Sequence, residues 1–226
     1  MGNRAIIKGI NQEIGIYLHW NGGYDSVKAF CEYCKLKGYR SPEQDSYGLA
    51  RMCQVIGNFF GGGLSLGLNI VPKHLLPDEV EDWWLDNGFY EIENWEIVNH
   101  MNPTPITLDM EDKGNYDLME FLEAINEKMP TDEQLPAEFL RSKEVAISEL
   151  KIGDKVYLQG INESYDEQYE VVGIGKDEVV NGYNVKGIPY VNRYESNGKY
   201  DNNCNNYLIS YRHGKKCTVR VAQSDK

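Results

Sequence analysis

Two short stretches near the start of the chain, residues 4–8 and 14–20, have the apolar–polar alternation of β-strands. We expect them to pair across a short connection at residues 9–13. Successive side chains of a strand point to opposite faces. The second stretch therefore carries one apolar face, made of Ile14, Ile16, Leu18 and Trp20.

Two helical patterns follow, and glycine bounds each of them. The first is expected to have its N-cap at Asp25 or Ser26 and to end at Gly38. The second begins at Ser41-Pro42-Glu43-Gln44, where an N-cap serine, a proline at the first helical position and a glutamine form a capping-box pattern. Gly61-Gly62-Gly63 is expected to end it.

Strand patterns return over residues 64–70 and 89–100, and the second of these predicts a hairpin that turns at Glu93-Asn94. The sum is a small sheet carrying two helices, which predicts an α+β domain over residues 1–102.

The residue pattern changes twice in the rest of the chain. Residues 103–147 start with an extended Asn/Pro/Thr segment and continue with helical patterns rich in acidic residues, so we expect an acidic helical connector. Residues 148–226 hold short β runs separated by Gly, Asn and Asp turns. Five or six short strands in about 75 residues predict a small β-barrel of the SH3-like class.

Composition and charge narrow the class of protein. Of 226 residues, 41% are hydrophobic and 26% are charged, as in ordinary globular proteins. The apolar runs are too short to span a bilayer, so no membrane partner is expected. The start of the chain lacks the hydrophobic core of a signal peptide, and its five cysteines are an odd number. Both features favour reduced thiols in the cytoplasm of a cell.

The negative charge is concentrated in the middle of the chain. Residues 77–149 carry 20 acidic and 4 basic side chains, a net charge of −16, against −12 for the whole chain. This segment is either a solvated surface or a surface that meets a basic groove of a partner. Direct binding to DNA is not expected. The acidic residues proposed to contact a partner are Asp78, Glu79, Glu81, Asp82, Glu91 and Glu93.

The cysteines allow two interpretations. Cys31 and Cys34 form a C-x-x-C pair, and Cys53 follows on the next predicted helix. A zinc site would need a fourth ligand, for which His19 is the local candidate. The pair falls on the apolar stripe of its helix, where cysteine behaves as a small hydrophobe. We therefore expect core cysteines and no metal or cofactor.

A second candidate site lies at the end of the strand over residues 14–20. Its members could line a polar pocket beside a flexible Gly-Gly, and they are Tyr17, His19, Asn21 and Asp25. Catalysis, contact with a ligand or partner, and structural hydrogen bonding all remain open, although no nucleophile accompanies the set. Gly61, Gly62 and Gly63 could bring backbone N–H groups to a phosphate, or could only stop a helix.

The runs over residues 14–27, 46–48 and 50–63, with the strings GIYLHWNGG and GNFFGGG, resemble a family of uncharacterised proteins encoded by phages, prophages and mobile elements of mostly Gram-positive bacteria. The resemblance covers about residues 1–100. It implies a setting in which small accessory proteins counter host defence. The expected function is non-enzymatic inhibition of a bacterial defence protein, for example a CRISPR effector. The alternative is a sponge or enzyme for a nucleotide signal that uses His19 and Gly61–Gly63.

Overall fold

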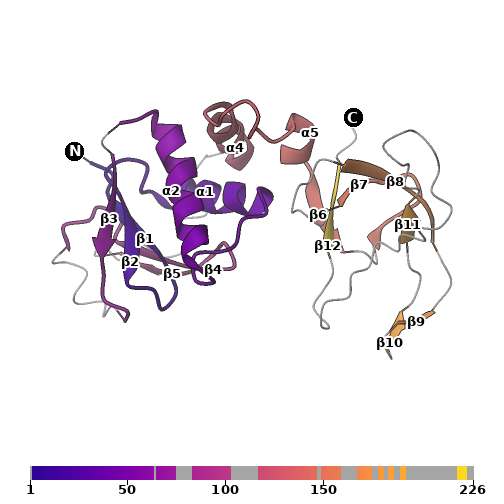
Figure 1. The fold of residues 1–226 in the computed structure, drawn as a ribbon, viewed down its shortest axis with the longest axis horizontal. Coiled ribbons are helices and arrows are strands. Elements are labelled where there is room, and N and C mark those ends of the chain that lie inside the picture. Colours follow the sequence, from indigo (N-terminus) through magenta and orange to yellow (C-terminus); the bar gives the residue numbers. More distant parts are fainter. Residues whose placement is uncertain are drawn as a thin grey trace. The chain divides into compact units, whose positions relative to one another are not determined.

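A computed structural model of the chain describes residues 2–63, 65–74, 83–102, 117–146, 149–158, 167–174, 178–180, 183–185, 189–191 and 218–222. The chain divides into two compact units, Met1–Leu135 and Pro136–Lys226 (Figure 1). Both contain a five-stranded sheet, and the helices are few. The predicted mixture of helices and strands is confirmed at this level.

The sheet of unit 1 has the strand order β3-β2-β1-β4-β5. Strands β1 and β4 are parallel, and every other neighbouring pair is antiparallel. The predicted pairing of the first two strands is therefore confirmed. The strand bounds are β1 Ala5–Gly9, β2 Ile14–Leu18, β3 Leu66–Ile70, β4 Phe89–Glu93 and β5 Glu96–Met101.

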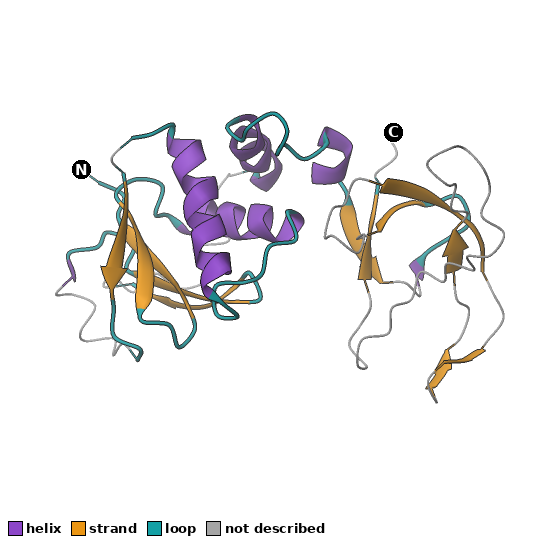
Figure 2. Cartoon of the chain, in the orientation of Figure 1, coloured by secondary structure: helices purple, strands orange, loops and turns teal. Residues whose placement is uncertain are grey.

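Three helices of unit 1 gather on one side of this sheet (Figure 2), and they are α1 Tyr24–Leu36, α2 Ser46–Phe60 and α4 Leu118–Glu127. Aromatic rings join them: Phe30 of α1 meets Phe59 of α2 and Phe121 of α4 at centroid distances of 5.4 and 5.9 Å. The Tyr33 hydroxyl also donates to Asn126 Oδ1 at 2.7 Å. Helix α4 thus belongs to unit 1, whereas the sequence placed it in a separate connector.

Both predicted helix starts differ from the structure. Gly23 is the N-cap of α1 and provides no side-chain cap, so Asp25 and Ser26 lie inside the first turn. The N-cap of α2 is Asp45, whose carboxylate accepts from the N–H groups of Tyr47 and Gly48. The expected cap at Ser41 is wrong, because this side chain accepts from Trp95 N–H at 3.0 Å instead. The Ser41 hydroxyl also donates to the Glu43 carboxylate, so both of its hydrogen bonds serve contacts other than a helix cap.

The predicted hairpin is confirmed, one residue later than expected. Asn94 and Trp95 have φ of 52° and 63° and connect β4 to β5 as a two-residue turn. The second face of the sheet is also covered: Ile6, Val71, Leu85 and Phe89 form a buried cluster there, with Tyr17, Trp83 and Met101 against it. The expected apolar face of β2 is only partly buried, since Ile14 and Trp20 are 48% and 45% exposed.

Unit 2 is rich in strands, as predicted. Its larger sheet has the order β11-β8-β7-β12-β6, and β9 pairs with β10 separately. The ring of Phe139 packs edge-on against Tyr157 at 5.0 Å. A barrel of the SH3-like class stays a prediction. The bounds are α5 Ala137–Leu140, β6 Lys143–Ala146, β7 Lys155–Leu158, β8 Glu167–Ile174, β9 Glu178–Val180, β10 Tyr183–Val185, β11 Pro189–Val191 and β12 Thr218–Val221.

Candidate functional site

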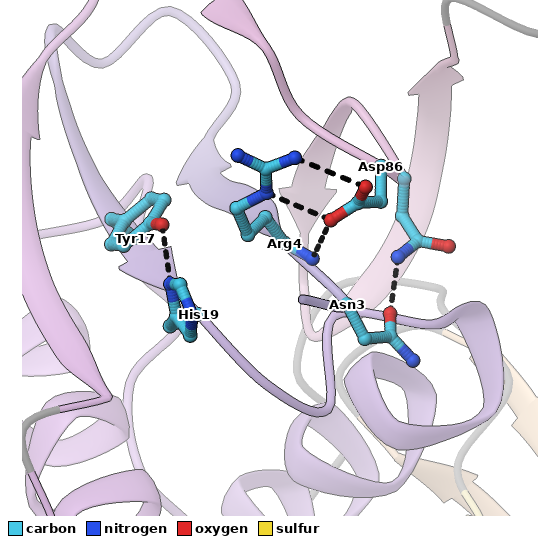
Figure 3. Close-up of polar contacts among 6 residues, drawn as sticks. Asn3, Arg4, Tyr17, His19 and Asp86 are labelled. Carbon is cyan, nitrogen blue, oxygen red and sulfur yellow. Dashed lines mark hydrogen bonds and ion pairs between the residues drawn. The ribbon is translucent and has the colours of Figure 1, made fainter. Parts of the chain in front are cut away.

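Tyr17 and His19 form a hydrogen-bonded pair at the end of β2 (Figure 3). They are two residues apart and therefore share one face of the strand. The Tyr17 hydroxyl lies 3.0 Å from His19 Nδ1, and the ring of Trp20 meets the imidazole edge-on at 5.0 Å. The pair could transfer a proton, but within the described residues no serine or cysteine nucleophile hydrogen-bonds to it.

A second polar group in the same view ties the start of β1 to the segment before β4 (Figure 3). Arg4 donates to both carboxylate oxygens of Asp86, from Nε at 2.8 Å and from a terminal nitrogen at 3.1 Å. Its backbone N–H adds a bond of 2.9 Å. These hydrogen bonds lower the pKa of Asp86 to about 2. The sequence did not predict this pair, because no local pattern connects residues 82 positions apart.

The other two residues predicted for this pocket come from the segment that joins β2 to α1 and from α1 itself. Asn21 adopts a left-handed φ of 54° in the turn before α1, and Asp25 occupies the first turn of that helix. Neither makes a hydrogen bond to Tyr17 or His19. The structure therefore supports a pair at this position, and Asp25 has the helix N-terminus as its favourable neighbour.

The three glycines end α2. Gly61 is the C-cap, with a left-handed φ of 64°, and its N–H donates to Asn58 O at 3.0 Å. The N–H of Gly63 donates to Phe60 O at 3.3 Å. Both donors are thus used by the helix end, where the dipole is negative and unfavourable to a phosphate. This geometry favours the role of a helix stop. Ser65, two residues after Gly63, accepts from His19 N–H at 2.9 Å, which joins the segment after the glycines to the strand end that carries the pair.

The predicted acidic contact residues have different surroundings. Asp78, Glu79, Glu81 and Asp82 lie outside the described residues. Glu93 is exposed at the end of β4. Glu91 is not part of an open acidic surface, because its side chain is only 13% exposed and lies 3.1 Å from Lys8 Nζ. It acts as an internal counter-ion.

Lys8 is a residue whose role sequence reasoning missed. Its side chain is completely buried, on the second face of the sheet. The ammonium donates to the carbonyl oxygens of Pro72 and Lys73 at 3.0 Å each, and to Gln12 O at 3.4 Å. Lys8 thereby fastens the chain after β3 to the centre of the sheet. A buried ammonium is tolerated only with partners of this kind.

The interpretation of the cysteines as core residues is confirmed for α1. Cys31 and Cys34 are buried, and Cys53 is partly buried. Burial raises the pKa of all three thiols, because desolvation disfavours the thiolate. Among the described residues, no group of three or more His, Cys, Asp and Glu side chains is placed to hold a metal ion.

We expect these thiols to react slowly. In native protein at pH 8, iodoacetamide should alkylate Cys31 and Cys34 roughly 100-fold more slowly than in protein unfolded in urea, because only an accessible thiolate attacks. Peptide mass spectrometry reads each cysteine separately, and the unfolded protein is the control. Equal rates in the native and unfolded protein would show that the α1 thiols are accessible and would favour the zinc-site interpretation again.

None of the helices that the structure describes is long and apolar enough to cross a membrane. Comparisons of the chain with known protein families, with curated proteins and with solved structures found no match.

Proposed function

We propose that the chain is a non-enzymatic binding protein that docks to another protein through a surface around Trp84. Trp84 is 80% exposed, although its neighbour Trp83 packs edge-on against Phe89 at 5.3 Å. The backbone of Trp84 has a φ of 53°. A left-handed conformation costs a non-glycine residue about 1–2 kcal/mol. An exposed tryptophan on an unfavourable backbone is the observation that carries the proposal.

Neighbouring features support an anchor at this position. Leu85 is 5% exposed and belongs to the buried cluster on the second face of the sheet. Asp86 is bound to Arg4 by three hydrogen bonds. The residues directly after Trp84 are therefore fixed to the sheet. A residue on a fixed backbone loses less conformational entropy on binding than one on a mobile loop, which is the property expected of an interface anchor.

The chemistry of the partner follows from the residues before Trp84. Asp78, Glu79, Glu81 and Asp82 place four carboxylates within six residues of the indole in sequence. The matching surface on a partner is a basic groove with an apolar pocket beside it. Grooves that bind nucleic acid have the basic part. In the setting that the resemblance implies, the proposed partner is a bacterial defence protein in the host cytoplasm, and the chain is a phage-encoded inhibitor of it.

Affinity capture from a bacterial lysate, read by mass spectrometry, tests the proposal. One dominant host protein should bind the native chain, and Trp84→Ala should reduce its recovery at least tenfold, as expected for a central aromatic anchor. Trp20→Ala is the matched control, because Trp20 is a second exposed tryptophan and should leave recovery unchanged. Unchanged recovery with Trp84→Ala contradicts the proposal. A nucleotide retained by the purified chain would favour the alternative, a nucleotide sponge at His19.

Charge reversal tests the acidic part of the surface. Exchanging Glu79, Glu81 and Asp82 for lysine should slow association with the captured protein several-fold. The association rate of the native chain should fall as salt rises from about 50 to 300 mM, and that of the variant should fall less. Thermal stability should change little if these residues lie at the surface. If the triple exchange leaves the association rate unchanged, the acidic segment is a solvated surface that does not contact the partner.

We also propose that unit 2 is a small barrel of the SH3-like class. Strand β12 pairs with both β6 and β7, and β8 pairs with both β7 and β11, which gives the continuous antiparallel arrangement that a barrel needs. Contacts between the backbones of β11 and β6, observed by NMR, would show that the sheet closes into a barrel. Contacts in the order β11-β8-β7-β12-β6 alone would define an open sheet.

A further inference from the structure

Strand β3 forms one end of the unit 1 sheet, and nothing in the described part of the chain pairs with its outer side (Figure 1). On the inner side, Val71 N–H donates to Glu13 O and Ser65 O accepts from His19 N–H, both at 2.9 Å. Main-chain groups alternate in direction along an antiparallel strand. The outward N–H and C=O groups therefore belong to Leu66, Leu68 and Ile70.

The side chains of the same three residues share the face of the sheet that carries the helices. Leu66 lies beside Gly57 of α2, but Leu68 and Ile70 are 64% and 85% exposed. Ile14, which is opposite Ile70 on β2, is 48% exposed. Within the described residues, the edge of β3 thus combines main-chain groups that have no strand partner with an exposed apolar strip that continues onto β2.

Protein sheets commonly protect an edge strand with charged residues, a bulge or proline. The opposite edge of this sheet has such protection: β5 begins at Glu96, which is ion-paired with Lys35, and its register with β4 shifts after Glu91. In contrast, no charged residue occurs from Phe59 to Pro72. No residue of β3 itself is therefore of a kind that prevents pairing with another strand. Pro72 follows the strand and only limits how far such pairing could extend.

We propose that β3 pairs antiparallel with β3 of a second copy of this chain, about a two-fold axis at Leu68. Leu68 then faces its own counterpart, and Leu66 of each copy faces Ile70 of the other. All three pairs have outward main-chain groups in both copies, so each exchanges two hydrogen bonds. The exposed Ile70 would lie beside the Leu66 that contacts α2 in the second copy.

Self-complementarity is the reason for choosing a second copy as the occupant. The apolar positions of β3 occur in the same order in both chain directions, as a two-fold interface requires. An uncharged edge presents no counter-charge to a basic or acidic strand of another protein. Each copy carries a net charge of −12, so the copies repel each other at long range. Self-association should therefore strengthen with salt, whereas binding through the proposed acidic surface should weaken.

Sedimentation velocity on the purified full chain tests this inference, independently of the Trp84 surface. Between about 2 and 200 μM, the native chain should change from monomer to dimer, with affinity of roughly micromolar order for an interface this small. Leu68→Lys should weaken association at least tenfold, because the two ammonium groups would face each other at the two-fold axis. Ile70→Lys should weaken it as strongly, because each ammonium would be placed against the apolar Leu66 of the other copy. Val98→Lys, at a 47% exposed position of β5, is the matched control and should dimerise normally.

Cross-linking tests the position of the two-fold axis. Leu68→Cys should form a disulfide-linked dimer through residue 68 on mild oxidation, because directly opposed residues are within reach of a disulfide. Ile70→Cys should form much less, since its counterpart there is Leu66. A native chain that stays monomeric at 200 μM, or Leu68→Lys with unchanged self-association, would overturn the inference. In that case a strand of a different protein, and not a second copy of this chain, would be the candidate to pair with the edge of β3.

Discussion

Replacing Glu91 by leucine is expected to lower the free energy of unfolding by about 3–5 kcal/mol. The substitution leaves the fully buried ammonium of Lys8 without its counter-charge, and only backbone carbonyl oxygens remain as partners. Removing one member of a buried ion pair is costly for this reason, even where the intact pair contributes little. Urea unfolding, followed by tryptophan fluorescence, measures the change.

Two further variants separate charge from hydrogen bonding. Glu91→Gln keeps an oxygen acceptor at 91 and should cost about 1–2 kcal/mol. The double variant Lys8→Met with Glu91→Leu should be more stable than Glu91→Leu alone, because no buried charge remains. Glu93→Gln is the control, since Glu93 is exposed two residues further along β4 and should change stability by less than about 0.5 kcal/mol. A Glu91→Leu effect as small as that of Glu93→Gln would show that Lys8 is not held by Glu91.

The ion pair shows where sequence patterns stop being informative. Periodicity predicted the strands of unit 1 and its first two helices, because each depends on residues that are neighbours in sequence. The alternation in β1 places Lys8 on the same face as Ile6, but it does not show whether that face is covered. The cover includes residues 71–73 together with Trp83 and Leu85, more than 60 positions later in the chain. Burial of Lys8 therefore could not be predicted locally.

The helix caps show a related limit. The pattern at Ser41 satisfies the rules for a capping box, but these rules assume that the side chains bond within their own turn. Here Ser41 accepts from Trp95 N–H, and Glu43 accepts from Asn94 N–H at 3.0 Å. The β4–β5 turn thus binds the serine of the expected box and the neighbouring Glu43, and Asp45 caps α2 instead. Ser41 was recognised as a residue capable of capping, but its partner Trp95 lies 54 positions later in the chain.

The candidate site divides in the same way. Tyr17 and His19 were predicted together because strand periodicity places residues i and i+2 on one face. Asn21 and Asp25 follow the strand end, where periodicity no longer applies, and in the described part of the chain neither is hydrogen-bonded to the pair. Trp84 was not singled out from the sequence, because exposure of a tryptophan is the exception. Its significance depends on its 80% exposure and positive φ, which only the structure provides.

Gly88→Ala is expected to destabilise unit 1 by about 4 kcal/mol or more, the range in which single substitutions are exceptional. Gly88 has a φ of 65°, and a Cβ there would overlap the carbonyl oxygen of Met101 and lie 2.8 Å from its carbonyl carbon. Neither backbone can move aside easily. Gly88 O accepts from Ile6 N–H at 3.0 Å, and Met101 is paired with Phe89 at the end of the β4–β5 hairpin.

Gly61 provides the matched control, because it separates backbone conformation from steric overlap. Its φ of 64° is almost the same as that of Gly88, but an added Cβ would meet nothing within 4 Å. Gly61→Ala should therefore cost only the left-handed strain of about 1–2 kcal/mol. Urea unfolding of both variants gives the difference, and a Gly88→Ala chain recovered only in insoluble form agrees with the larger effect. Equal and small losses for the two variants would mean that β1, β4 and β5 do not meet at Gly88 as described.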